Sequence, residues 1–115
     1  MTRTDLVLAV IPDRDFRHSV VFALGTEGFA VDSCGDLTEA LASLHVDAAA
    51  CIIVDDKAID DWRTAADQFS LFAKPVILLI SFLRPIPELS QVTFVTKPFL
   101  GAPLIEAVRH AVAGH

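Results

Sequence analysis

The amino-acid sequence predicts an α/β protein in which five parallel strands alternate with helices. Five short segments consist largely of apolar residues, and most of the segments between them have the apolar spacing of amphipathic helices. Apolar runs without polar alternation are typical of strands buried on both faces. Strands that alternate with helices form a parallel sheet through right-handed crossovers, with helices on both faces. The sequence therefore predicts one doubly wound domain over residues 1–115.

The five predicted strands are bounded by proline, glycine or charged residues. They are Leu6–Ile11, Phe29–Cys34, Ala49–Val54, Val76–Ser81 and Val92–Thr96. The third strand runs directly into two adjacent carboxylates, Asp55 and Asp56. In open parallel sheets, functional side chains gather beyond the carboxyl ends of the strands, where the strand order reverses. Asp55 is the first polar residue beyond such an end, so it is the leading candidate for a functional side chain.

Apolar residues at helical spacing predict helices over residues 15–27, 37–44, 61–72 and 103–112. Asp13 and Asp36 stand where a short polar side chain can accept the first backbone N–H groups of a helix. Between the fourth and fifth strands, Pro85 and Pro87 disfavour helix in the residues that precede them. The helix expected at this place is therefore predicted to be short or missing.

Composition and charge exclude several classes of function. The net charge of −6 argues against a nucleic-acid-binding surface, because phosphate contacts need clustered Lys and Arg. No apolar stretch approaches the about 20 residues that cross a bilayer, and the first residues lack the features of a signal peptide. We therefore expect a cytoplasmic protein that binds neither nucleic acid nor membrane. Cys34 and Cys51 are expected to be buried thiols.

Thr96-Lys97-Pro98-Phe99 after the fifth strand, together with Asp55 after the third, resembles the receiver domain of two-component response regulators. The resemblance extends from Leu6 to about Val112. It implies a flavodoxin-like fold with the strand order 2-1-3-4-5, and a signalling module in place of an enzyme. It also gives Lys97 the role of pairing with the phosphoryl oxygens, Phe94 that of an aromatic switch, and the Lys97–Pro98 peptide bond a cis conformation.

In this family an aspartate carboxylate attacks a phosphoryl group and forms an acyl phosphate. Asp55 matches that phosphoacceptor. A Mg²⁺ ion held mainly by carboxylates neutralises the developing charge. The resemblance places Ile11 and Pro12 where the family has two acidic residues after the first strand, and only Asp13 follows them. Since neither Ile nor Pro offers a side-chain oxygen, we expect weak or absent Mg²⁺ binding, with Asp13, Asp55 and Asp56 as the candidate ligands and no required cofactor.

A second departure lies at the end of the fourth strand. The resemblance implies a Thr or Ser hydroxyl that moves toward the phosphoryl group, but this position is occupied by Ile80, with Ser81 one residue later. A shift of one residue reverses the side-chain direction in a strand. Ser81 would reach the site only if the strand end is bent or bulged.

Three hypotheses follow. The first is an atypical receiver that acts as a protein-interaction module with impaired Mg²⁺-dependent phosphorylation. The second is a receiver phosphorylated on Asp55 with a rebuilt metal site. The third is a small-ligand-binding domain or enzyme on the same architecture, which a deep pocket at the strand ends would favour.

A receiver would have protein partners. We expect a histidine kinase or phosphotransfer protein along the first helix. A target protein or a second copy, forming a homodimer, would bind along the face made by the fourth strand, the fifth strand and the last helix.

Overall fold

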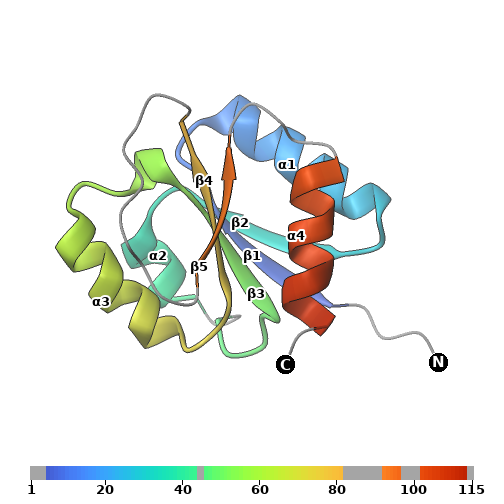
Figure 1. Ribbon diagram of the computed structural model, residues 1–115. Coiled ribbons are helices and arrows are strands. Elements are labelled where there is room, and N and C mark those ends of the chain that lie inside the picture. Colours follow the sequence, from blue (N-terminus) through green and yellow to red (C-terminus); the bar gives the residue numbers. More distant parts are fainter. Residues whose placement is uncertain (1–4, 44–45, 82–91, 97–101, 114–115) are drawn as a thin grey trace.

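The computed structural model of the protein describes residues 5–43, 46–81, 92–96 and 102–113. Its sheet has five parallel strands in the order β2-β1-β3-β4-β5, as the sequence predicts (Figure 1). The strands are β1 (Leu6–Val10), β2 (Ala30–Cys34), β3 (Cys51–Asp55), β4 (Val76–Ile80) and β5 (Val92–Thr96). The first, second and fourth are one residue shorter than predicted, and the third is displaced so that it includes Asp55.

Helices cover both faces of the sheet, which confirms the doubly wound architecture. Two of them, α1 (Arg14–Thr26) and α4 (Ala102–Ala113), lie on one face (Figure 1). On the other face lie α2 (Leu37–Leu41) and α3 (Trp62–Phe72), and a short 3₁₀ helix, η1 (Asp56–Ala58), follows β3. None of the helices within these described ranges is long and apolar enough to span a membrane.

The second helix is shorter than the sequence predicts. It ends at Leu41, and beyond it the Ser43 hydroxyl donates a hydrogen bond to the Asp32 carboxylate of β2 at 3.2 Å. Serine competes with helical hydrogen bonding through such side-chain contacts, which helical periodicity alone does not reveal. The predicted shortening of the helix between β4 and β5, with Pro85 and Pro87, falls on residues 82–91, outside the described residues.

Successive residues of the central strands pack into two separate cores. Leu8, Ile52 and Leu78 face α2 and α3. Their neighbours in the chain, which include Ile53 and Ile77, face α1 and α4. Successive side chains of a strand point to opposite faces of a sheet, so a sheet covered on both sides needs apolar residues at every position. This arrangement explains the uninterrupted apolar runs, and it leaves the carboxyl ends of the strands as the place where polar residues begin.

Candidate functional site

The phosphoacceptor candidate, Asp55, is the last residue of β3. It pairs with Leu79 in the adjacent strand β4, and it is 1% exposed. Its Oδ1 atom accepts a hydrogen bond from the backbone N–H of Lys57 at 3.0 Å, which makes Asp55 the N-cap of η1. The Oδ2 atom is also buried. The carboxylate therefore lies at the carboxyl edge of the sheet, where the strand order predicts a functional group.

The next residue, Asp56, is also 1% exposed. Its Oδ2 atom accepts a hydrogen bond from the backbone N–H of Ser81 at 2.9 Å. This bond joins the residue after β3 to the residue after β4. A buried carboxylate is costly unless hydrogen bonds compensate for the lost water, so the contact accounts in part for an acid at this depth.

At the end of β1, the position that the resemblance assigns to an acidic residue is part of the hydrophobic core. Ile11 is 0% exposed and packs with the α1 and α4 side of the sheet. Its backbone N–H donates to the Cys34 carbonyl at 2.9 Å, and its own carbonyl accepts from the Arg17 guanidinium at 3.0 Å. The adjacent Pro12 is exposed. The β1 end thus presents a buried alkyl side chain and a cationic group from α1.

Asp13 caps α1. It is exposed, and its Oδ1 atom accepts hydrogen bonds from the backbone N–H groups of Asp15 at 2.9 Å and Phe16 at 3.2 Å. These bonds satisfy two donors that the first turn of a helix leaves open. The sequence named Asp13 both as a helix cap and as a candidate metal ligand, and the structure gives its carboxylate the first of these roles.

The residues described here do not fit a Mg²⁺ site. Mg²⁺ requires near-octahedral oxygen ligation, usually with carboxylates among the ligands. Among the residues in the described ranges, no group of three or more His, Cys, Asp or Glu side chains is arranged to hold a metal ion. Asp13 caps its helix, and Asp56 Oδ2 already accepts the Ser81 N–H.

The candidate switch residues lie on β4 and β5 or directly follow β4. Ile80 is buried, pairs with Thr96 and packs in the core beneath α2 and α3. Ser81 is exposed, and its backbone N–H, bound to Asp56, is what it contributes to the site. Phe94 is half-buried opposite Leu78 and packs against the same core as Ile80.

Two further candidate site residues cannot be placed. Lys97, Pro98 and the cis peptide bond expected between them lie outside the described residues.

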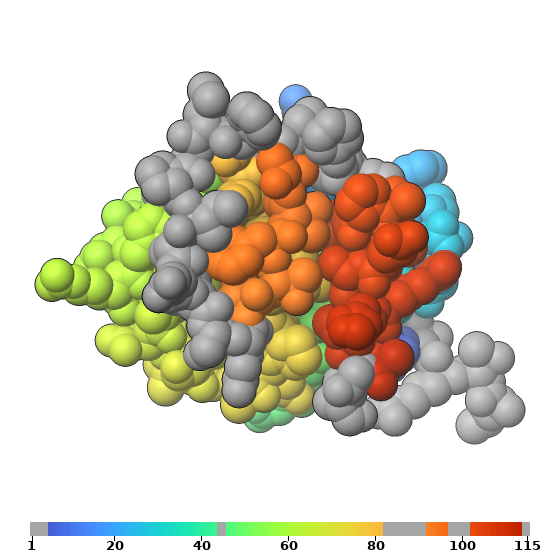
Figure 2. Space-filling model, in the orientation of Figure 1, coloured from blue at the N-terminus to red at the C-terminus, as the bar shows by residue number. Residues whose placement is uncertain are grey.

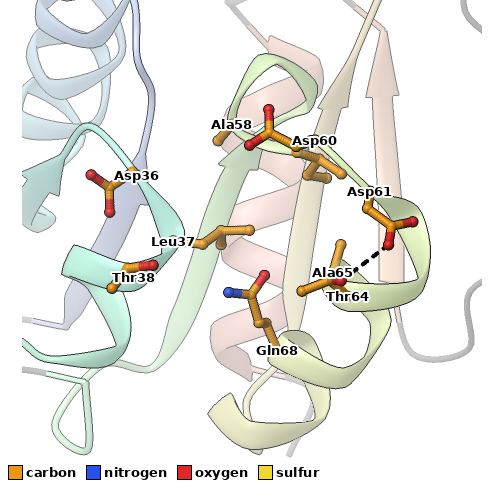
Figure 3. Close-up of a pocket in the computed structure, with 10 residues that line it drawn as sticks. Asp36, Leu37, Thr38, Ala58, Asp60, Asp61, Thr64, Ala65 and Gln68 are labelled. Carbon is orange, nitrogen blue, oxygen red and sulfur yellow. Dashed lines mark hydrogen bonds between the residues drawn. The ribbon is translucent and has the colours of Figure 1, made fainter.

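A cavity of about 280 Å³ lies beside η1, between the starts of α2 and α3. Figure 3 shows Asp36 at the start of α2 and Asp60 and Asp61 just before α3 around this cavity. Asp36 and Asp61 cap the two helices, and Asp61 also accepts a hydrogen bond from the Thr64 hydroxyl at 3.1 Å. Carboxylates repel phosphate and other anions. The acidic residues around this cavity therefore make it unfavourable for an anionic ligand.

Both cysteines are free thiols, as the sequence predicts, with Cys51 buried and Cys34 half-buried. Burial raises the pKa of Cys34 to about 11, and the nearby carboxylates, with Glu39 first, contribute to this rise. Burial raises the pKa of Cys51 to about 12. The thiolate is the reactive form of cysteine, so both side chains are expected to be inert near neutral pH.

The chain matches no protein-family model. It is 34% identical over 107 residues to the transcriptional regulator protein FixT of Rhizobium meliloti, and the match covers 92% of this chain and 91% of FixT. It is 30% identical over 124 residues to the C4-dicarboxylate transport transcriptional regulatory protein DctD of the same organism. That second match covers 96% of this chain but only 26% of DctD.

Solved structures share the fold. The structure of FixJ-N superposes with a TM-score of 0.76 at 21% identity, covering 96% of this chain and 95% of the other. The chemotaxis protein CheY4 of Vibrio cholerae gives a TM-score of 0.75 at 22% identity, with 95% and 99% coverage. A response regulator receiver protein from Sinorhizobium medicae gives 0.74 at 17% identity, with 96% and 95% coverage. The chain matches nearly the whole of FixT and shares the fold of these structures. It belongs to the receiver domains of two-component response regulators, which are signalling modules and not enzymes.

Proposed function

We propose that this receiver domain is an atypical one, which acts as a protein-interaction module whose state is not set by Mg²⁺-dependent phosphorylation of Asp55. The observation that carries the proposal is the fully buried Ile11 at the end of β1, where receiver domains have a metal-binding acid. Receiver domains generally use Mg²⁺ at the phosphorylation site, so a change at this position affects the chemistry directly. Asp13, the nearest carboxylate in the sequence, is engaged as the cap of α1.

Electrostatics support the same proposal. A phosphoryl group that reaches Asp55 brings negative charge to a buried carboxylate that already has a second one, Asp56, beside it in the chain. Like charges at a buried site repel strongly unless a cation offsets them. In phosphoryl transfer that offset is largely the task of the metal ion. Without the β1 acids, Mg²⁺ binding should be weak or absent, and the transfer to Asp55 should be slow.

The second candidate function is a receiver phosphorylated on Asp55 through a rebuilt metal site. The observation in its favour is the place of Asp55 itself, at the end of β3 and at the carboxyl edge of the sheet. Asp56 would have to release the Ser81 N–H to become a metal ligand. We rank this candidate second because it requires that rearrangement as well as a new set of ligands.

The decisive experiment is intact mass spectrometry of the protein after incubation with a small phosphodonor, with and without Mg²⁺. We expect no Mg²⁺-dependent phosphoryl adduct. The Asp55→Asn variant is the matched control, because it removes the nucleophile while keeping the size of the side chain. An adduct that forms with Mg²⁺ on the native protein and not on Asp55→Asn would overturn the proposal in favour of the second candidate.

Receiver domains interact with histidine kinases or phosphotransfer proteins, and α1 provides a surface for such a partner. Phe22, on the outer side of α1, is 74% exposed. Aromatic side chains, phenylalanine included, are enriched at protein interfaces relative to the rest of the surface. We propose that a kinase or phosphotransfer protein binds here, in the cytoplasm. Phe22→Ala should weaken that binding, whereas Leu71→Ala, an exposed apolar residue on α3, should not.

A target protein or a second copy of the chain would bind at β5 and α4, the last strand and helix of the face predicted for such contacts. Figure 2 shows the surface of β5 next to that of α4. A groove of about 570 Å³ runs between them, lined by residues that include Phe94, Val95, Pro103 and Ala107. Within the described residues, the last strand also forms one edge of the sheet. Sedimentation at high concentration tests self-association, and a monomer throughout would contradict a homodimer.

A further inference from the structure

We propose that the Asp56 carboxyl group is a resident hydrogen-bond acceptor at the carboxyl edge of the sheet: its Oδ2 atom binds the backbone N–H of Ser81 and so holds the carboxyl end of β4 in one position. This inference rests on the proposed function and deepens it, because it names what fixes the conformation of a receiver that phosphorylation does not switch. The inference is based on the hydrogen bond that the Ser81 N–H donates to Asp56 Oδ2 at 2.9 Å. The two residues are 25 positions apart in the chain.

The first step concerns the donors at the carboxyl edge. The oxygens of an acyl phosphate on Asp55 would need hydrogen-bond donors, and backbone N–H groups beyond strand ends are suited to bind anions. The structure places two such groups here, those of Lys57 and Ser81, and both donate to carboxylates of the chain itself. Lys57 donates to Asp55 at 3.0 Å, and Ser81 donates to Asp56 at 2.9 Å. The Ser81 donor is thus already bound to a carboxyl oxygen of the chain itself.

The second step concerns the strength of this contact. Asp56 is 1% exposed, so water competes little for its carboxylate. The electrostatic part of a hydrogen bond grows where water is excluded. Removing the acceptor would leave the Ser81 N–H without this partner at a part-buried place. The bond is therefore a structural anchor.

The third step concerns the sheet. Asp55 pairs with Leu79, so Asp56 and Ser81 lie just beyond the last pair of the β3–β4 ladder. The residue before Ser81, Ile80, pairs with Thr96 at the end of β5. Holding Ser81 therefore also constrains Ile80, and through it the end of β5. The anchor connects the acceptor loop to both strands of the face where partner binding is proposed.

The test is amide hydrogen exchange at Ser81, read by NMR. The Asp56→Ala variant removes the acceptor, and we expect Ser81 exchange to accelerate about tenfold, since the Ser81 amide loses its hydrogen-bond partner. Asp56→Asn keeps a side-chain carbonyl oxygen that can accept, so it should retain part of the protection. Asp60→Asn is the matched control, because it removes one negative charge from an exposed acid four residues away.

Unchanged Ser81 exchange in Asp56→Ala, with the amides of β3 and β4 still protected, would overturn the proposal. If Asp56→Ala fails to fold, the native protein provides a second measurement. A scalar coupling across the hydrogen bond, between the Ser81 amide nitrogen and the Asp56 carboxyl carbon, is expected. Rapid Ser81 exchange in the native protein without that coupling would reject the anchor.

These measurements use neither phosphodonor nor Mg²⁺. The proposal of the Asp56–Ser81 anchor and the proposal that Asp55 is not phosphorylated with Mg²⁺ can therefore be rejected independently. A Mg²⁺-dependent adduct on Asp55 would overturn the proposed function while leaving the Ser81 result to be judged from its own exchange rate.

Discussion

The Arg17 guanidinium of α1 donates a hydrogen bond at 3.0 Å to the backbone carbonyl of Ile11, the residue that follows β1. This contact ties the first helix to the strand end at which receiver domains hold their metal-binding acids. The Arg17 guanidinium is therefore hydrogen-bonded to a backbone carbonyl at this strand end, and the side chain of Ile11 is buried in the core. The end of β1 is thus stabilised by packing and by this hydrogen bond.

Replacing Arg17 tests that contact. We expect Arg17→Ala to lower the free energy of unfolding by about 1 to 2 kcal/mol, because a half-buried carbonyl loses a charged donor. Urea unfolding monitored by circular dichroism measures the change. The control is Arg14→Ala, which removes an exposed arginine from the first turn of the same helix. Equal losses for the two variants would show that the Ile11 contact contributes nothing specific.

Restoring the acidic pair should create a metal response. In an Ile11→Asp/Pro12→Asp variant, a carboxylate replaces a fully buried side chain, so we expect a lower thermal midpoint without metal. Mg²⁺ should recover part of that loss, because a ligand that binds only the folded state stabilises it. The native protein should show no shift with Mg²⁺. Thermal scans with and without Mg²⁺ make the comparison, and a clear shift in the native protein would contradict the absence of a metal site.

The end of α3 offers a stabilising substitution. Ala73 is in the left-handed conformation, with φ of 54°, and its backbone N–H bonds to the Ser70 carbonyl. A Cβ atom disfavours this conformation, whereas glycine adopts it freely. We expect Ala73→Gly to raise the stability by about 1 kcal/mol, measured by urea unfolding. Ala66→Gly is the control: it places glycine inside the same helix, where glycine is unfavourable, and should lower the stability by a similar amount. A loss in both variants would show that Ala73 is not strained.

The two thiols predict a decline of stability at high pH. The pKa of Cys34 is about 11 and that of Cys51 about 12 in the folded protein, both above the ordinary value of 9.0. Between pH 9 and 11 the unfolded chain loses these protons while the folded one keeps them, so the free energy of unfolding falls as pH rises. Denaturant titrations at several pH values measure the slope. A Cys34→Ala/Cys51→Ala variant should show a shallower decline, and an identical slope would contradict the raised pKa values.

The fold could be predicted because it depends mainly on the polarity of individual side chains along the sequence. An uninterrupted apolar run such as Ile52–Val54 has no exposed face, which leaves only a sheet covered on both sides. The place of Asp55 followed from the same run, since the acid comes where the core ends. Cap residues such as Asp13 and Asp36 were also recognisable, because their effect depends only on the next few residues.

The contacts that distinguish the site could not be predicted, because their partners are backbone atoms distant in the chain. Nothing in the identity of Ser81 indicates that its N–H faces Asp56, and the bond depends on where β3 and β4 end side by side. The Arg17 contact with the Ile11 carbonyl depends in the same way on the packing of α1 against the sheet. The sequence pointed to Asp56 as an acid next to the phosphoacceptor candidate and as a candidate metal ligand. A pair of consecutive carboxylates after a buried strand was the available signal.

The hydrogen bond between Asp56 and Ser81 has a consequence for how such a domain would carry information. An acyl phosphate has a lifetime, so a receiver that depends on it reports the recent activity of a kinase. A carboxyl group of the polypeptide has no such lifetime, so a conformation that depends on the Asp56–Ser81 hydrogen bond would not decay with a phosphoryl group. The output of a domain fixed in this way depends on how many copies the cell contains. Its control would then lie in synthesis and degradation.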